Sequence, residues 1–299
     1  MSTGTNKVVT LSEAVSLIKD GDLVAIGGHA AHGHPIALVR EIIRQGRRRL
    51  HIAGLSNGID MDMLVGAGCV GTVETSHVAI DGSDLPPNYR RAAEDGTIQV
   101  IGHSETTALS RFRAASVGAP YILIRSELGV DPRTNPHLRE VTDVFSGDPY
   151  VAVEAIRPDI ALIHAHAADD EGNVQLSVES CQHTITDMMI AQSARAVIVS
   201  VEQIVSAKAI KSRPNATLPH SAITCVVEVP FGAHPCSYNG RYEHDREHLA
   251  QYIAASATAA GLEQWLDGYV RAPADNDEFL ERIGMKRLMD ISTKRLIRQ

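Results

Sequence analysis

The sequence predicts an α/β fold with an open, largely parallel sheet flanked by helices. Short, continuously apolar runs, of the kind buried on both faces of a parallel sheet, alternate with segments of helical periodicity. Hydrophobic residues make up 44% of the chain and charged residues 21%, an ordinary globular composition. We expect one domain over residues 1–299, with a helical C-terminal region at about 245–299.

The first predicted elements are a helix and a buried strand. Thr10 and Glu13 form a capping box ahead of apolar residues at helical spacing. Residues 23–26 are all apolar and predict a short strand. Pro35 then begins a second helix, which ends in the basic group 47–49, where cations oppose the negative end of the helix dipole.

The same alternation continues along the chain. Further strands are predicted at 51–55, 70–75, 97–101, 121–124, 160–164, 196–200 and 226–229. Further helices are predicted at 60–66, 87–94, 106–117, 184–193 and over most of 245–283. The polar, turn-rich stretch 131–149 is expected to be a long surface loop.

Charge and cysteine content exclude several classes of protein. With 28 basic and 36 acidic residues spread along the chain, the net charge is −8, and no basic stripe for nucleic acid or anionic lipid is present. No apolar run approaches the roughly 18 residues of a membrane span, and residues 1–15 lack the apolar stretch of a signal peptide. We therefore expect a cytoplasmic protein with reduced, mostly buried thiols at its separated cysteines, Cys69, Cys181, Cys225 and Cys236.

A glycine-rich turn follows the first strand, between Asp20 and Pro35. Gly27 and Gly28 allow positive φ and close approach of a ligand to the backbone. The free N–H groups of the helix that begins at Pro35 would favour an anion. A purely structural turn has the same composition, so both interpretations stay open. The spacing fits neither a dinucleotide-binding fingerprint nor a Walker A loop.

This turn resembles the first signature of family I coenzyme A transferases, in which an Asp-Gly or Asn-Gly pair, three apolar residues, Gly-Gly-Phe and Gly-x-Pro follow one another. His29 replaces the usual Phe. The matching residues are Asp20, Gly21, Val24, Ala25, Ile26, Gly27, Gly28, Gly33 and Pro35. Segments 158–174, 200–205 and 230–235 are also similar to glutaconate-type α subunits.

The resemblance implies the open α/β fold of CoA transferases (NagB/RpiA-like) and a homologous β subunit in an αβ or α2β2 assembly. It implies a coenzyme A thioester as substrate, with no bound cofactor or metal. It also implies substrate- or CoA-binding roles for a group of eight residues. These are Gly27, Gly28, His29, Gly33, Ser56, Asn57, Ser104 and His164.

The family's nucleophile is a glutamate in a Ser-Glu-Asn-Gly motif of the β subunit, which attacks the thioester to form an acyl-glutamyl anhydride. This chain has no such motif. As the α subunit of an acyl-CoA:carboxylate CoA-transferase, which is our first expectation, it would supply half of an active site.

Segment 104–120 resembles a part of the α subunits in which many transferases carry a glutamine where this chain has Glu105. The related steroid-ring-opening hydrolases carry a glutamate there, taken to be the base for hydrolytic C–C cleavage of a cyclic keto acyl-CoA. Glu105 is therefore the candidate catalytic residue, and such a hydrolase is the alternative function. An ordinary first-turn helix acid is the structural alternative.

Three groups of histidines suggest further interpretations. His29, His32 and His34 crowd the glycine turn but lack a carboxylate or thiol at matching spacing, so no metal is expected there. His164 and His166 are two apart on a strand and would share a face. Segment 244–248 fits H-x-x-E-H, a zinc-protease pattern that arises easily by chance among 14 histidines. A ligand-sensing regulator on the same fold is the non-enzymatic alternative, but the short N-terminal segment leaves no room for its DNA-binding helices.

Overall fold

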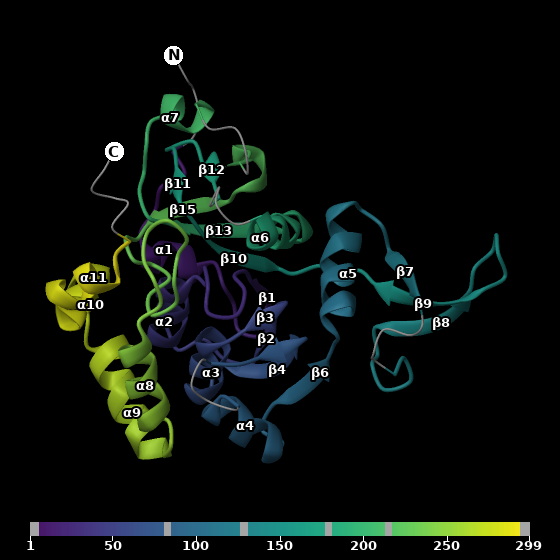
Figure 1. Ribbon diagram of the computed structural model, residues 1–299, viewed down its shortest axis with the longest axis horizontal. Helices are drawn as coiled ribbons and strands as arrows, with labels where there is room; N and C mark the ends of the chain where they lie inside the picture. The colour runs from purple at the N-terminus through teal and green to yellow at the C-terminus, as the bar shows by residue number, and fades with distance from the viewer. Residues whose placement is uncertain (1–5, 81–84, 126–130, 177–180, 213–216, 294–299) are drawn as a thin grey trace.

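The computed structural model describes residues 6–80, 85–125, 131–176, 181–212 and 217–293. Its centre is a seven-stranded sheet with the order β15-β13-β10-β1-β2-β4-β6, in which all neighbours are parallel (Figure 1). The strands are β1 (Leu23–Ile26), β2 (Leu50–Ala53), β4 (Val70–Thr75), β6 (Gln99–Gly102), β10 (Ile160–Ala165), β13 (Ala196–Val201) and β15 (Cys225–Glu228). The predicted α/β fold with a largely parallel sheet is confirmed.

Helices cover both faces of this sheet because alternate strand residues point to opposite sides. Val24 and Ile26 belong to one core cluster with the first two helices and α3, whereas Ala25 belongs to a second cluster with Phe112 and Ile190 of the opposite face. The helices are α1 (Leu11–Ser16), α2 (Ile36–Arg44), α3 (Ile59–Gly66), α4 (Pro87–Glu94), α5 (Glu105–Ser116), α6 (Cys181–Ser193) and α7 (Ala207–Lys211). The expected capping box of α1 is present.

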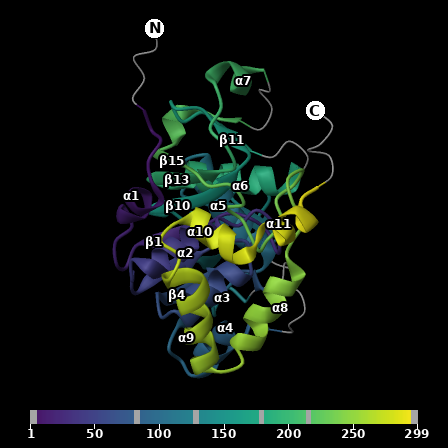
Figure 2. The same cartoon turned by 90° about the vertical axis from the view of Figure 1, so that its left-hand side faces the viewer.

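The C-terminal region is helical, as predicted from about residue 245. It contains α8 (Arg246–Ala255), α9 (Ala259–Leu266), α10 (Asn276–Ile283) and α11 (Met285–Ile291). These helices gather on the side of the molecule that carries α2 (Figure 2). Leu249, Leu262 and Leu266 join the same core cluster as α2 and α3, and the guanidinium of buried Arg40 lies 3.5 Å from the ring centroid of Phe279.

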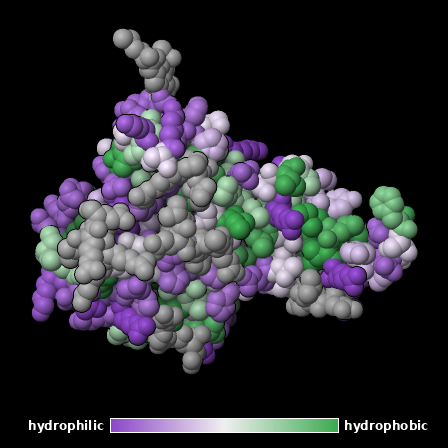
Figure 3. All heavy atoms as spheres, turned by 45° about the horizontal axis from the view of Figure 1, so that its top comes forward, coloured by the Kyte–Doolittle hydropathy of each residue, from purple (hydrophilic) through white to green (hydrophobic). Residues whose placement is uncertain are grey.

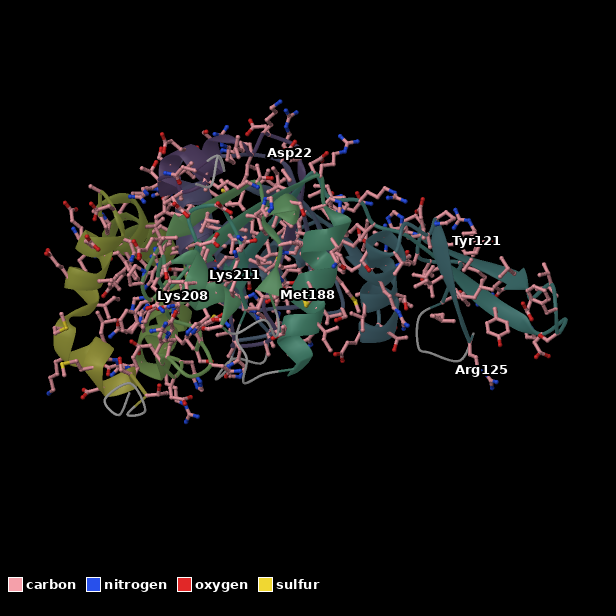
Figure 4. The ribbon with its side chains drawn as sticks, turned by 90° about the horizontal axis from the view of Figure 1, so that it is seen from above. Asp22, Tyr121, Arg125, Met188, Lys208 and Lys211 are labelled. Atoms are coloured by element: carbon pink, nitrogen blue, oxygen red, sulfur yellow. The ribbon has the colours of Figure 1, made fainter. Side chains whose placement is uncertain are left out.

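A three-stranded antiparallel sheet, which we call the arm, projects from the body beside α5 (Figure 1). Its order is β7-β9-β8, with β7 (Tyr121–Arg125), β8 (Leu138–Thr142) and β9 (Pro149–Glu154). Viewed from above, Tyr121 and Arg125 mark the two ends of β7, far from Met188 of α6 (Figure 4). Apolar surface is gathered on the arm (Figure 3), where Tyr121 is 52% and Phe145 96% exposed.

The arm corrects two expectations. The strand predicted at 121–124 exists, but it belongs to the arm and not to the parallel sheet. The surface loop expected at 131–149 is wrong over 138–142, which pairs with β9. The sequence there is polar because the residues between its buried ones face solvent, and its partner strand supplies the hydrogen bonds that the composition cannot reveal.

Short strands were also missed: β3 (Ser56–Asn57) with β5 (His77–Val78), and β11 (Ala167–Ala168) with β12 (Val174–Gln175) and β14 (Thr217–Leu218). Two residues are too few to show a period. Cys69, Cys225 and Cys236 are buried and free, as predicted, whereas the side chain of Cys181 lies outside the described part. Each helix in the described ranges is too short or too polar to cross a bilayer.

Candidate active site

Most of the predicted site residues gather at one edge of the main sheet, where β1, β2 and β6 end. The carboxyl ends of parallel strands all lie at the same edge, which is where open α/β sheets bind ligands. The glycine turn follows β1, the pair 56–57 follows β2, and the pair 104–105 follows β6. The N–H of Ala30 donates to the carbonyl of Ser56 at 3.0 Å, which ties the first two segments together.

Glu105 is the first residue of α5, and it is exposed. Ser104 caps this helix, since its hydroxyl accepts the N–H of Thr107 at 3.2 Å. Half burial lowers the pKa of His29, and the carboxylate of Glu105 opposes that shift, so the two side chains lie within electrostatic range of each other. The candidate carboxylate therefore is exposed and lies near the glycine turn.

The backbone amides of the glycine turn and of the start of α2 already have acceptors within the protein. The N–H of Gly27 donates to Leu162 O, that of Gly28 to Asp187 Oδ1 and that of Gly33 to Ser237 O, each at 2.9 Å. The amides of Ile36 and Ala37, at the start of α2, bond to His34 O and Gly232 O at 2.8 and 2.9 Å. These five amides are thus committed within the protein, which favours the structural interpretation of the turn over anion binding by free N–H groups.

Packing explains why glycine is needed at two of these positions. A Cβ at Gly27 would lie 2.5 Å from Asp187 Oδ1 and 2.8 Å from Ile163. Gly28 has φ +93, and its Cβ would lie 2.7 Å from both the backbone N and the ring Nδ1 of His34. The turn therefore lies directly on α6 and on a buried imidazole, whether or not a ligand is bound.

A buried acid–base group lies beneath the turn. His34 Nδ1 lies 3.3 Å from Asp60 Oδ2, and both side chains are fully buried. Burial opposes charge on His34, but Asp60 outweighs it and raises the pKa of the imidazole. Burial likewise opposes charge on Asp60, but His34, Asn57 and Gly58 hold its pKa below the ordinary value. Burial raises the pKa of Asp187 to about 7.

The predicted binding residues Ser56 and Asn57 are 6% and 0% exposed. Asn57 Nδ2 donates to Asp60 Oδ2 at 2.7 Å, and Asn57 Oδ1 accepts the hydroxyl of Thr75 at 2.9 Å. In this structure the two residues join the turn after β2 to the His34–Asp60 pair. Their side chains shape the edge from below, and their predicted contact with substrate stays a prediction.

His164 is 1% exposed and lies at the end of β10. Its Nδ1 is 2.8 Å from Ser200 Oγ and its Nε2 2.8 Å from Glu202 Oε1. Glu202 also accepts the hydroxyl of Tyr242 at 2.7 Å and the N–H of Phe231 at 3.1 Å. Burial opposes charge on Glu202, but these donors lower its pKa. His166 differs from His164: it is partly buried and lies 3.2 Å from Arg241 Nη2.

Two buried glutamates, Glu202 and Glu74, were not singled out from the sequence. Glu74 is the only acid of β4 and stands one residue before its end. Glu202 directly follows the last residue of β13, a strand without acids. The signal that was available is position: an acid at the carboxyl end of a strand in a parallel sheet lies at the ligand-binding edge.

The histidine patterns form no metal centre in the described ranges, where no group of three or more His, Cys, Asp or Glu residues is arranged to hold a metal ion. His32 bonds to Ser237. Within H-x-x-E-H, Glu247 pairs with Arg287, and His248 packs 4.8 Å from the Tyr269 ring, measured between centroids. The ring of His248 is thus packed among the aromatic side chains of the C-terminal helices.

Comparison with known proteins fits this geometry. The family model described as coenzyme A transferase matches residues 8–229, and the chain belongs to this family. It is similar to the A subunit of 3-oxoadipate CoA-transferase of Pseudomonas knackmussii, with 32% identity over 93% of this chain and 98% of the relative. It is 36% identical to a protein of Archaeoglobus fulgidus over 93% of this chain, and it spans 62% of that protein's length.

Among solved structures, the chain is similar to glutaconate coenzyme A-transferase of Acidaminococcus fermentans, with a TM-score of 0.88, 28% identity and 96% coverage of both chains. It is also similar to the decarboxylase AibA/AibB, C56S variant, with a TM-score of 0.79, 35% identity and coverage of 89% and 98%. The cholesterol ring-cleaving hydrolase IpdA subunit of Rhodococcus jostii is 27% identical over 91% of this chain. The identification as a CoA transferase of the α-subunit type is confirmed.

Proposed function

We propose that this chain is the α-type subunit of an acyl-CoA:carboxylate CoA-transferase whose glutamyl nucleophile comes from a β subunit, in an αβ or α2β2 assembly. The observation that carries the proposal is the glycine turn at the edge where β1, β2 and β6 end, in a chain whose residues 8–229 match the coenzyme A transferase family model. The chain offers no Ser-Glu-Asn-Gly glutamate of its own. Relatives named as the A subunits of CoA transferases support a two-subunit enzyme in which the other subunit supplies the nucleophile.

The proposed reaction proceeds through the carboxylate of the β subunit. That carboxylate attacks the thioester carbonyl and releases CoA thiolate, which leaves an acyl-glutamyl anhydride. The thiolate then attacks the glutamyl carbonyl and releases the donor acid, so that CoA becomes attached to the enzyme. The acceptor carboxylate takes the CoA by the same two steps in reverse. Glu105 and His29 line the acyl side of this site, and the buried residues below the turn keep the edge in place.

The same proposal covers the setting of the enzyme. The substrate is a coenzyme A thioester, no bound cofactor takes part, and the enzyme acts in the cytoplasm. The family membership and the buried, free thiols of Cys69, Cys225 and Cys236 support this setting, since a reducing compartment keeps thiols free.

The test is a trapping experiment on the purified αβ complex. The complex is incubated with a panel of acyl-CoA substrates that includes succinyl-, glutaconyl- and 3-oxoadipyl-CoA, and borohydride is then added. We expect loss of activity and reduction of one glutamate of the β chain, because a thioester is reduced and a free carboxylate is not. Full activity after borohydride with every active acyl-CoA would overturn the proposal.

A hydrolase that opens a ring of a cyclic keto acyl-CoA is the second candidate. Glu105 favours the hydrolase, because the resemblance to ring-opening hydrolases implies a glutamate at this position. Here Glu105 would act as the base that activates water. Glu105→Gln separates the two candidates, since a transferase keeps much of its activity and a hydrolase loses nearly all of it. Measuring CO2 release in the same assays tests for the decarboxylation that another relative is named for.

A further inference from the structure

A cluster of four side chains, of which three are buried and His51 is partly exposed, lies beneath α5. We call it the Glu74 cluster: Glu74, His51, His103 and Arg111. Glu74 is 3% exposed and stands near the end of β4. Its Oε1 accepts from His103 Nε2 at 3.0 Å, and its Oε2 accepts from His51 Nε2 at 3.0 Å. Arg111 of α5 forms an ion pair with the same carboxylate. One carboxylate therefore joins β2, β4 and α5.

The charges in this cluster balance. Burial lowers the pKa of His51 and of His103 to about 4, so both rings are neutral donors at neutral pH. Burial also lowers the pKa of Arg111, to about 10, which leaves it charged. One cation thus faces one anion, with two neutral hydrogen bonds in addition. A buried ion pair of this kind is strongly destabilised when one partner is removed, because the remaining charge has no compensation.

The cluster reaches Glu105 through His103. The other ring nitrogen of His103, Nδ1, lies 3.2 Å from Thr107 Oγ1, and its backbone N–H donates to Thr75 O at 3.1 Å. Thr107 is also the residue whose N–H is accepted by the capping hydroxyl of Ser104. The ring of His103 is therefore held on one side by Glu74 and on the other by Thr107. Glu105 lies between His103 and Thr107 in the chain.

The cluster also reaches the arm. Arg111 Nε donates to the carbonyl of Glu154 at 3.1 Å, and the carboxylate of Glu154 lies 2.8 Å from His137 Nδ1. Asn135 Nδ2 donates to Gly102 O, immediately before His103, at 2.8 Å. The segment that carries Glu105 is thus fixed from the sheet on one side and from the arm on the other.

We propose that Glu74 and His103 are positioning residues that hold the first turn of α5 so that Glu105 stays near the glycine turn. The Glu74 carboxylate is buried and is bonded to His51, His103 and Arg111, so it acts through His103 and Thr107. The proposal rests on the proposed role of Glu105 in the reaction. It adds that a carboxylate one strand away fixes the placement of that residue.

Four variants of the chain in the αβ complex test this. Glu74→Gln removes the charge, and His103→Leu removes both ring nitrogens. His103→Gln restores a donor near the position of Nε2. Asp62→Asn is the matched control: Asp62 is equally buried, accepts from Tyr252 at 2.6 Å and Asn88 at 2.8 Å, and lies in a network separate from α5.

Amide hydrogen exchange over residues 103–107 gives a readout that does not depend on activity. We expect faster exchange there in Glu74→Gln and His103→Leu, and unchanged exchange in Asp62→Asn. In the active complex, kcat in the first two variants should fall by a factor no larger than the fall in Glu105→Gln, because misplacing that carboxylate cannot cost more than removing it. KM should stay within about twofold of wild type, and His103→Gln should recover most of the lost kcat, since positioning affects the reaction more than binding.

Unchanged exchange over 103–107 in Glu74→Gln and His103→Leu would overturn the proposal. So would faster exchange with unchanged kcat in a complex whose kcat falls in Glu105→Gln, because the anchored segment would then not matter for the placement of Glu105. If Glu105→Gln is fully active while Glu74→Gln is inactive, Glu74 acts by another route and the positioning role fails. Exchange results remain decisive even if the complex proves not to be a transferase, so the two proposals fail separately.

Discussion

Replacing Gly28 by alanine should destabilise the protein far more than the same change at Gly46. Gly28 has φ +93, and its new Cβ would lie 2.7 Å from the backbone N of His34 and 2.8 Å from the carbonyl of His32. Gly46 has φ +65, with nothing within 4 Å of its Cβ. Backbone atoms and a ring held by Asp60 cannot move away as the end of a flexible side chain could.

The magnitudes follow from these two environments. A non-glycine residue with left-handed backbone dihedrals costs about 1–2 kcal/mol, which both variants incur. Overpacking adds about 1–3 kcal/mol, and only Gly28→Ala incurs it. We therefore expect a loss of about 1–2 kcal/mol for Gly46→Ala and about 2–5 kcal/mol for Gly28→Ala.

Urea denaturation of the two variants and the wild type, with linear extrapolation to water, measures the difference. The transitions should be followed by circular dichroism and by tryptophan fluorescence, since coincident curves support two-state analysis. Equal losses in the two variants would refute the reasoning, because the turn would then relax around a Cβ at no cost. A smaller loss at Gly28 than at Gly46 would refute it more strongly.

Three further predictions concern other buried groups. Burial lowers the pKa of His248 to about 3, below its unfolded value near 6.5, so its contribution to stability is present above pH 6.5 and is lost as pH falls toward 3. The difference in unfolding free energy between wild type and His248→Phe should shrink by about 1.4 kcal/mol per pH unit from pH 6 to 4, and a pH-independent difference contradicts this. Glu202→Leu leaves His164 and Tyr242 without their acceptor and should cost about 2–6 kcal/mol in urea denaturation, at about 1–3 kcal/mol for each buried group, whereas a loss below about 1 kcal/mol would show that the network is dispensable. Tyr252→Phe removes one donor to Asp62 and should lower the unfolding free energy by about 1–3 kcal/mol, and no change in the urea midpoint would contradict the hydrogen bond.

The sequence could predict the parallel sheet because its strands are continuous apolar runs. Segments such as 160–164 and 196–200 are short and, up to their last residue, continuously apolar, which is typical of strands buried on both faces of a parallel sheet. The arm strand 138–142 has only two apolar residues, Leu138 and Val141, so its pattern is as weak as that of a loop. Its stability comes from pairing with β9, a contact that depends on the fold and not on local composition.

The sequence predicted which residues belong to the candidate site, but few of the contacts between them. Family resemblance named the glycine turn, the pair 56–57 and Glu105 as site residues, and the structure brings them together at one edge of the sheet. It gave no hint that Gly28 donates to Asp187 or that Asn57 supports Asp60, because these contacts join residues far apart in the chain or point inward. Buried polar groups need partners that only the folded chain assembles.

Relatives of this chain are named for transfer, hydrolysis and decarboxylation, and the exposure of Glu105 bears on which of these reactions the chain would support. Glu105 stands at the first turn of α5, where its carboxylate is exposed and can accept hydrogen bonds from groups that approach the strand edge. On the proposed function the β subunit covers this edge, so the groups it brings would decide between transfer, hydrolysis and decarboxylation. Identical positioning of Glu105 in the α subunit is compatible with all three, because the bond that breaks is selected by the partner's nucleophile and by the water that it admits or excludes.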